Sequence, residues 1–320
     1  MVQYTIYGGE LSYFSRKLEA ALIFYGADYE FKPKQDPSIE ARSGTHQVPV
    51  LHTPENWMIG DTTPLLRMLD ARHPSRAMFP AGKLGVLVHV LEEHFDEWLA
   101  RTMVHYRWHY PESAEFASMR MASGNREAAQ RVLSWGPRAC RATGTESAQQ
   151  RQAAEDEYVR ILEAAEAQLK DTAFLLGDRP TALDCIVLGG LRAHTNMDPV
   201  PKRVVAGYPT VVDWAERRAD DWDGAGELAP FPASTPFAQH VLGEMPTTYK
   251  RYALANRDAQ MAGAKAFHTE IYGEDVSYLS RPYPEQSRQM LIERIDNLDS
   301  DARVAVNTWL VDQKLADAFA

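Results

Sequence analysis

The chain has only two cysteines, Cys140 and Cys185, which lie far apart in a sequence of 320 residues. Disulfide-stabilised secreted domains carry a denser cysteine framework, so we expect both thiols to be reduced. The sequence also lacks an apolar run long enough to cross a bilayer, and no basic region followed by an apolar run opens it. These absences predict a cytoplasmic protein without a membrane partner.

Positive charge is also scarce. Lys and Arg number 34 against 44 Asp and Glu, which gives a formal net charge of -10. A general nucleic-acid binder needs a positive surface, so this balance argues against nucleic acid as a partner. Hydrophobic residues make up 45% of the chain and charged residues 24%, which is ordinary for a globular protein, and the length predicts two or three compact units. The composition favours a protein that acts on small molecules or on other proteins.

Residues 1–80 carry the pattern of a compact α/β unit. Helical spacing of apolar residues, strand-like runs and a Pro-containing hairpin pattern follow one another. The expected order is strand, helix, strand, hairpin and helix, over residues 3–7, 14–25, 28–32, 48–59 and 63–73.

The remainder divides into two parts. Residues 84–222 are expected to be all-helical, because apolar residues recur at alternating four- and three-residue steps, for example from Leu84 to Trp98. Residues 223–320 open with a stretch rich in Gly and Pro, and weak alternation around Gly273 indicates a hairpin. Two further helices are expected over residues 284–298 and 301–319.

Five motifs occur in a fixed order along residues 3–222. They are YTIYGGELSYFSRKLEAALIFYGADYE, QVPVL, IGDTTPLLRMLD, FLLGDRPTALDCIVLGGL and YPTVVDWAERR. This series resembles the serine-type cytosolic glutathione transferases. The resemblance implies a thioredoxin-like, glutathione-binding α/β domain over 1–80 and an all-α transferase domain over 84–222. The α+β extension over 223–320 lies outside the usual pattern. A homodimer and a role in detoxification are further implications of the resemblance.

The tetrapeptide from Ser12 to Ser15 lies between the first strand and the first helix, where thioredoxin-type redox proteins carry two cysteines. Hydroxyls replace both sulfurs here, so dithiol exchange at this point is excluded. The resemblance implies that Ser12 donates a hydrogen bond to the sulfur of glutathione, with Ser15 and Tyr13 as alternatives. Such a bond, worth roughly 1.5–3 kcal/mol, would lower the thiol pKa by about one to two units. Alternatively, Ser12 only caps the helix, as serine often does.

The resemblance also implies the residues that bind glutathione. Pro49 would form a cis peptide bond, so that the backbone of Val48 pairs with the cysteinyl part of the tripeptide. Asp61 would bind the γ-glutamyl ammonium group, and Thr62 would bind its carboxylate at the start of a helix. Gln47 is a further candidate. Without a ligand, the same Asp-Thr-Thr-Pro sequence is an ordinary helix cap.

The end of the long helix is dense in aromatic and basic side chains. In the family this helix end overlooks the pocket for the second substrate, which implies a hydrophobic electrophile there. The candidates are His105, Tyr106, Trp108 and His109, with Arg107 available for an anionic substrate. Packing of this helix end against the extension is the alternative. His105 and His109 lack a nearby carboxylate or cysteine cluster, so no metal site is predicted.

The predicted function is that of a glutathione transferase, in which the thiolate of glutathione attacks an electrophilic carbon. Conjugation, ether cleavage and isomerisation use the same thiolate, and the sequence does not separate them. The alternative is a non-catalytic protein that keeps the fold to bind ligands or other proteins. The extension could close the pocket and select the substrate.

Thr181 and Asp184 form a capping-box pattern that we interpret as structural.

Overall fold

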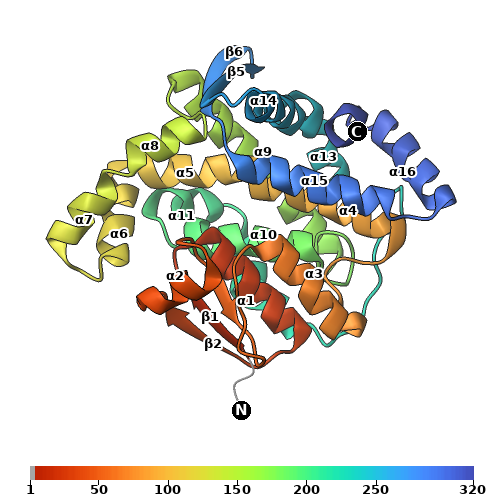
Figure 1. Cartoon of the computed structure of the whole chain (residues 1–320), viewed down its shortest axis with the longest axis horizontal. Helices are drawn as coiled ribbons and strands as arrows, with labels where there is room; N and C mark the ends of the chain where they lie inside the picture. The colour runs from red at the N-terminus through yellow and green to blue at the C-terminus, as the bar shows by residue number, and fades with distance from the viewer. Residues whose placement is uncertain (1–3) are drawn as a thin grey trace.

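The computed structural model describes residues 4–320, and its N-terminal part is built on a four-stranded sheet of order β2-β1-β3-β4 (Figure 1). Strand β1 runs parallel to β2 and antiparallel to β3, and β3 and β4 form the predicted hairpin. The elements are β1 (Tyr4–Gly8), α1 (Tyr13–Tyr25), β2 (Tyr29–Pro33), α2 (Pro37–Ser43), β3 (Val50–His52), β4 (Met58–Ile59) and α3 (Thr62–Arg72).

Helix α1 begins and ends where its sequence predicts. Ser12 caps its start, and Gly26 ends it in the left-handed region at φ 66°, where glycine is favoured. The sequence pattern does not predict helix α2, because Ile39 is its one buried residue and no apolar stripe marks it.

The second part of the chain is helical. A near-continuous helical run comprises α4 (Gly82–Glu93), a π-helical turn η2 (His94–Leu99) and α5 (Ala100–Trp108). The remaining helices are α6 (Pro111–Met121), α7 (Arg126–Leu133), α8 (Gly136–Ala142), α9 (Ala148–Asp171), α10 (Ala182–Gly190), α11 (Pro199–Val205) and α12 (Pro209–Glu216), with short turns η1 (Pro74–Arg76), η3 (Leu191–Thr195) and η4 (Arg218–Asp221).

Helices α1 and α10 join the first two parts at close range. A Cβ atom on Gly189 would lie 2.6 Å from the carbonyl oxygen of Tyr13, so this approach requires a residue without a side chain. At the start of α10, Thr181 and Asp184 form the predicted capping box. The buried Asp184 carboxylate also accepts the N–H of Leu175 at 2.9 Å.

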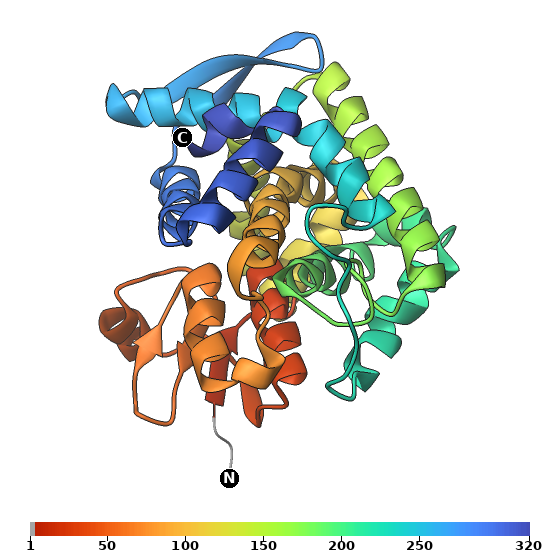
Figure 2. The ribbon, with the colours of Figure 1, turned by 90° about the vertical axis from the view of Figure 1, so that its right-hand side faces the viewer.

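The C-terminal extension (residues 223–320) packs along α4, as Figures 1 and 2 show for α15 and α16. Its hairpin of β5 and β6 confirms the prediction around Gly273. Its elements are α13 (Pro236–Glu244), η5 (Met245–Thr247), α14 (Tyr249–Met261), β5 (Ala266–Ile271), β6 (Glu274–Leu279), α15 (Pro282–Asp296), α16 (Ser300–Asp312) and η6 (Ala316–Phe319).

Two expectations for the extension are corrected. Helices α13 and α14 were absent from the predicted elements, because the Pro-rich stretch before them masks the apolar spacing of Phe237, Val241 and Tyr249. The predicted helix over 301–319 ends at Asp312 instead, and Lys314 with φ 59° begins the turn into η6. The fold class is confirmed: a thioredoxin-like α/β domain, an all-α domain and an α+β extension, sharing one hydrophobic core.

Candidate functional site

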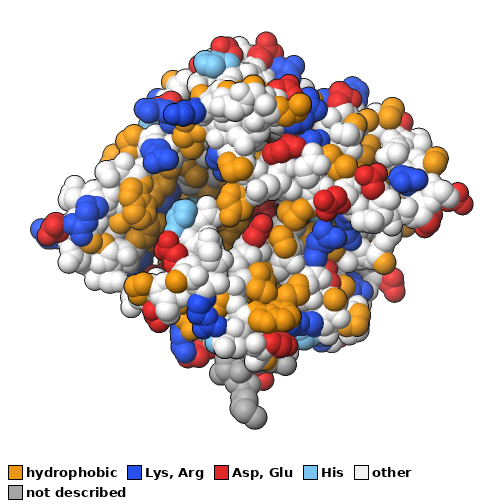
Figure 3. All heavy atoms as spheres, viewed as in Figure 1, with side chains coloured by type: hydrophobic (Ala, Val, Ile, Leu, Met, Phe, Trp, Pro, Cys, Tyr) orange, Lys and Arg blue, Asp and Glu red, His pale blue; other side chains and the backbone are white. Residues whose placement is uncertain are grey.

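A cavity of about 260 Å³ lies where the start of α3, the π-helical turn and the extension meet. Hydrophobic side chains line the hollow that is visible near the middle of the molecule in Figure 3. All three parts of the chain contribute walls. The lining residues used below are Phe14, Gln47, Val48, Pro49, Asp61, Thr62, Asp96, Glu97, Trp98, Arg101, Val104, Tyr252, Tyr278, Arg281, Tyr283, Ser287 and Met290.

The structure brings the five predicted glutathione-binding residues together on one wall of this cavity. Gln47, Val48, Pro49, Asp61 and Thr62 all line it. The peptide bond between Val48 and Pro49 is cis, as the resemblance implies. This wall therefore offers backbone groups of an exposed sheet end and the first N–H groups of α3 to a ligand.

Asp61 precedes α3 in a strained backbone conformation, with φ 67° and ψ 114°. A positive φ is unusual for a residue other than glycine and often marks a functional site. The Asp61 side chain makes no capping hydrogen bond of good geometry to α3, although the nearby Thr63 backbone N–H favours its charged form. The cavity walls partly desolvate its carboxyl, and Asp96 adds negative charge, so the pKa of Asp61 is raised.

Ser12 precedes α1 and does not line the cavity, whereas Phe14, in the first turn of α1, does. The half-buried Ser12 Oγ accepts the N–H of Ser15 at 3.2 Å. Its own O–H donates to no residue between 4 and 320, so the hydroxyl keeps a free donor. Ser12 therefore caps the helix through its oxygen and can still donate a hydrogen bond through its O–H.

The two alternatives to Ser12 are turned away from the cavity. The buried Ser15 Oγ accepts the N–H of Gly9 at 3.3 Å, beneath the sheet. The buried Tyr13 hydroxyl donates to the carbonyl oxygen of Phe95 at 3.1 Å. Both hydroxyls thus serve the packing of α1.

A buried lysine lies behind the predicted glutathione wall. Lys17 Nζ donates to Asp96 Oδ2 at 2.6 Å, to Thr63 Oγ1 at 3.0 Å and to Glu92. Burial lowers the pKa of Lys17, but Asp96 and Glu92 together outweigh this effect, so its pKa stays above the ordinary value. Burial raises the pKa of Glu92 to about 7 despite the lysine.

A second pair of carboxylates on the same helical run faces the extension. The buried Glu93 accepts a hydrogen bond from Tyr249 Oη at 2.9 Å and another from Ser287. Glu97 Oε2 lies 3.5 Å from Arg281 Nη2. Burial raises the pKa of Glu93 and, although Arg281 opposes the effect, raises that of Glu97 to about 7.

The far wall of the cavity comes from the extension and from the helix that faces it. Arg281 is held in place because the buried Asn256 side chain pairs with both its backbone N–H and C=O at 2.9 Å. Its guanidinium donates to Tyr252 Oη at 2.7 Å. The extension's lining residues are Tyr252, Tyr278, Arg281, Tyr283, Ser287 and Met290.

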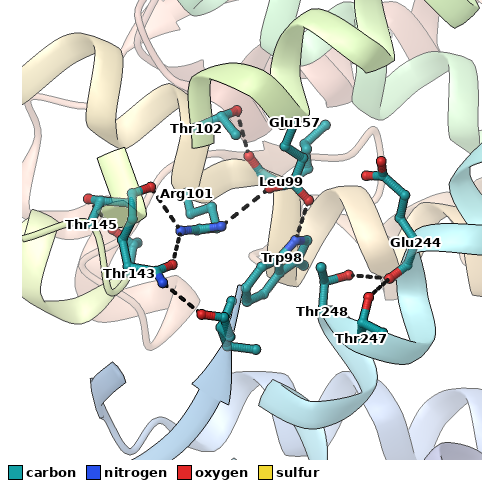
Figure 4. A network of polar contacts seen from close by, with 12 residues as sticks. Trp98, Leu99, Arg101, Thr102, Thr143, Thr145, Glu157, Glu244, Thr247 and Thr248 are labelled. Atoms are coloured by element: carbon teal, nitrogen blue, oxygen red, sulfur yellow. Dashed lines mark hydrogen bonds and ion pairs between the residues drawn. The ribbon is translucent and has the colours of Figure 1, made fainter. Parts of the chain in front are cut away.

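Figure 4 shows how polar contacts fix Trp98 and Arg101 on the facing helix. Glu157 accepts the indole N–H of Trp98 at 2.6 Å and Arg101 Nη1 at 3.3 Å. Arg101 also donates to Gln150 Oε1 at 2.9 Å, and the Gln150 amide donates to the carbonyl oxygen of Ile271 at 2.8 Å. The hairpin of the extension is thereby tied to the cavity wall.

The predicted second-substrate residues do not line this cavity. His105 is buried and its Nε2 contacts Glu155 at 2.7 Å, whereas Tyr106 packs against Tyr158. His109 stacks on His105.

Trp108 approaches Gly136 of α8, and Arg107 is buried in a two-bond contact with Asp198. One to two helical turns earlier, Trp98, Arg101 and Val104 line the cavity, and the aromatic helix end packs against α8 and α9.

Two family models match parts of the chain. The family model described as glutathione S-transferase, N-terminal domain, matches residues 6–77, and the model for the C-terminal domain matches residues 148–217. These matches support the glutathione S-transferase superfamily. Neither match reaches the C-terminal extension. Among curated protein sequences, none matches this chain.

Several solved structures resemble the chain at low sequence identity. The beta-etherase LigF from Sphingobium sp. strain SYK-6 is 13% identical, with a TM-score of 0.50, and the match covers 70% of this chain and 97% of that one. A glutathione S-transferase from Rhodospirillum rubrum F11 is 20% identical, with a TM-score of 0.47, covering 68% and 90%. A glutathione transferase homolog from Sulfitobacter with bound glutathione is 14% identical, with a TM-score of 0.42, covering 70% and 95%.

Two features are absent from residues 4–320. In this part of the chain, no three His, Cys, Asp or Glu side chains are grouped to hold a metal ion. No helix there combines the length and apolar character that a membrane span needs.

Proposed function

We propose that this protein is a glutathione transferase that activates the thiol of glutathione for attack on a hydrophobic electrophile. The observation that carries the proposal is the convergence of Val48, Pro49, Asp61 and Thr62 on one cavity wall. Asp61 suits the γ-glutamyl ammonium group, because its carboxylate is exposed to the cavity and makes no capping hydrogen bond of good geometry to α3. Thr62 and the N–H groups that open α3 suit the neighbouring carboxylate.

Ser12 is the proposed donor to the glutathione sulfur. Its oxygen is already oriented by the Ser15 N–H, which leaves the O–H proton for a thiolate. A hydrogen bond to a charged acceptor is worth roughly 1.5–3 kcal/mol, which corresponds to a thiol pKa lowered by about one to two units. The N-terminal end of α1 favours negative charge in the same place.

Substitution of Ser12 tests this role. Ser12→Ala should raise the pKa of the bound thiol by about one to two units and lower turnover at neutral pH about tenfold or more, with much of the glutathione affinity kept. Ser12→Thr keeps both the cap and the hydroxyl and should retain most of the activity. The pKa is read from the ultraviolet absorbance of the thiolate during pH titration. An unchanged thiol pKa in Ser12→Ala would remove Ser12 from the mechanism.

Loss of the helix cap is a separate effect that needs its own control. Ser12→Ala is expected to lower stability by about 1 kcal/mol through the lost cap. Asp299→Ala removes a comparable cap, since Asp299 Oδ1 accepts the N–H of Ala302 at 2.8 Å on α16. That variant should lose similar stability and keep its turnover.

The second candidate function is a non-catalytic protein that binds ligands or other proteins. Six side chains of the extension line the cavity and narrow the space for an electrophile, which favours this alternative. They are Tyr252, Tyr278, Arg281, Tyr283, Ser287 and Met290. A protein of this kind would bind glutathione or another ligand without turnover, and Ser12→Ala would then change nothing kinetically. The homodimer, the cytoplasmic location and the role in detoxification are predictions that follow from the family resemblance.

A further inference from the structure

Glu97 has the fewest polar partners of the four carboxyl groups on the helical run from Glu92 to Glu97. Glu92 and Asp96 share the buried ammonium group of Lys17, and Glu93 accepts two hydroxyl groups. Within residues 4–320, the Glu97 carboxyl group has one hydrogen-bonding partner, Arg281, whose Nη2 lies 3.5 Å from Glu97 Oε2. Its side chain is 10% exposed, and it lines the cavity.

Glu97 lies on the face of the helical run that is turned toward the extension. Glu92 and Asp96 face the N-terminal domain, where Lys17 neutralises them, whereas Glu93 and Glu97 face the extension. The wider turn at His94–Leu99 lies where the helical run passes the cavity, and such turns are frequent at functional sites. Asp96, Glu97 and Trp98 all contribute to the lining.

The surroundings of Glu97 suit a carboxyl group that gives up and regains a proton. The Arg281 side chain is 38% exposed, and Asn256 anchors the Arg281 backbone. The Arg281 guanidinium is thereby held close to the Glu97 carboxylate. The rings of Trp98 and Tyr252 line the cavity beside the pair. A proton donor in such a place can act directly on a substrate held against these rings.

We propose that Glu97 is the general acid of the transferase reaction, protonating the oxygen atom of electrophiles that leave negative charge on oxygen. This assignment rests on the proposed function. As the thiolate of glutathione forms a bond to the electrophilic carbon, the bond from that carbon to oxygen breaks, and the oxygen takes the proton of Glu97. The Glu97 carboxylate then pairs with Arg281. The proton that is released when the next glutathione thiol ionises then reprotonates the Glu97 carboxylate.

The charge around Glu97 supports a protonated resting state near neutral pH. Burial is the largest influence and raises the pKa of Glu97 to about 7; Arg281 and Lys17 oppose it, and Asp96 and Asp61 reinforce it. A general acid works best when its pKa lies near the operating pH. The titratable groups that face it from the packed elements are Lys17 of α1, Asp61 before α3, Glu93 and Asp96 of its own helical run, Tyr249 and Tyr252 of α14, and Arg281 before α15.

The proposal narrows the substrate class. Aryl ethers and epoxides develop an oxyanion when a thiolate attacks, and a positioned acid accelerates such steps by about 10²–10⁴-fold. Alkyl halides leave as stable anions and need no proton. The favoured substrates are therefore aromatic compounds that present an oxygen leaving group or an epoxide to the face lined by Glu97.

Two compounds with one carbon skeleton test the assignment. Phenacyl chloride and phenacyl phenyl ether give the same thioether with glutathione, but only the ether requires a proton for its leaving group. Glu97→Gln should lower kcat/KM for the ether about 100-fold and leave the chloride within roughly threefold. The control is Glu244→Gln, since Glu244 pairs with Arg160 at 2.5 Å outside the cavity lining. It should change neither rate.

The pH profile of the full-length wild type gives an independent readout. Because the acid must be protonated, ether cleavage should decline above about pH 7 as Glu97 loses its proton, whereas the chloride reaction should not decline. If Glu97→Gln does not fold, Glu97→Asp provides the test, because it keeps a carboxylic acid. Its ether cleavage should be slower than that of the wild type but should still decline above about pH 7.

The outcomes are distinct for the proposal and for the function on which it rests. Equal losses with both compounds in Glu97→Gln, or an unchanged ether rate, would overturn the assignment while the transferase remains. Wild-type turnover of the chloride alone would also overturn it. An absence of wild-type turnover with both compounds would contradict the proposed function and the assignment together.

Discussion

Replacement of the buried Lys17 tests the electrostatic account of the wall behind the proposed glutathione site. Lys17 and Glu92 have fully buried side chains, and Asp96 is 10% exposed. Lys17→Met removes the only cation that contacts Glu92 within residues 4–320, and leaves the Thr63 hydroxyl, 2.9 Å from Glu92 Oε1, as its donor. Breaking a buried pair in this way costs about 3–5 kcal/mol of unfolding free energy.

The same substitution should change how stability depends on pH. In the wild type the folded-state pKa of Glu92, about 7, lies above the unfolded value, so the folded state binds more protons and this contribution to stability declines as pH rises toward 7. Without Lys17, which lowers that pKa, the decline should continue above pH 7. The gap between Lys17→Met and the wild type should then widen by up to about 1.4 kcal/mol per pH unit.

Urea unfolding followed by tryptophan fluorescence at pH 6 to 9 measures both effects. Adding Glu92→Gln to Lys17→Met removes the more deeply buried of the two carboxylates that lost their cation and should recover about 2 kcal/mol or more. Lys170→Met is the matched surface control, because Lys170 is 60% exposed and pairs with Glu166 at 3.2 Å. It should cost at most about 1 kcal/mol. A Lys17→Met cost below 1 kcal/mol at pH 8, with no widening of the gap, would refute the reasoning.

Three further predictions follow from the packing. Asp184→Ala should lower the unfolding free energy by about 2–4 kcal/mol, because it strands buried N–H groups, against about 1 kcal/mol for the exposed cap in Asp299→Ala; equal losses in urea unfolding would contradict this. Deletion of residues 223–320 should abolish native helicity and promote aggregation, because it uncovers α4. A soluble truncated protein with native circular dichroism, in any oligomeric state, would contradict this. Val104→Phe should raise the KM for the electrophile several-fold and leave glutathione affinity unchanged, whereas His109→Ala should alter neither quantity. If His109→Ala raises the KM and Val104→Phe does not, the electrophile binds at the aromatic helix end and not in this cavity.

Much of the architecture follows from local signals in the sequence. The Gly26 stop, the hairpin at Gly273 and the Thr181–Asp184 capping box each depend on a few neighbouring residues, and each lies where it was expected. The role of the residues from Gln47 to Pro49 follows from the family resemblance and not from a local signal, because an X-Pro bond is ordinarily trans; all three line the cavity.

The rest of the site depends on contacts between distant segments. The apolar stripe from Leu84 to Trp98 marks one buried face, but Glu92 and Glu93 are buried as well, and their partners come from α1, α14 and α15. Four carboxylates spaced within six residues of an apolar helix were a usable signal, since buried charges require partners. Nothing in the spacing identifies Arg281 as one of them, because it lies 184 residues away from Glu97.

Calorimetric titration of the full-length protein with glutathione tests the central claim most directly. The account predicts binding with an affinity between micromolar and low millimolar, weakened about tenfold or more in Asp61→Asn, because the ammonium group then loses its carboxylate partner. Ser12→Ala should bind nearly as well as the wild type. An absence of binding at several millimolar glutathione, or equal binding by Asp61→Asn, would contradict the claim that this cavity is a glutathione site.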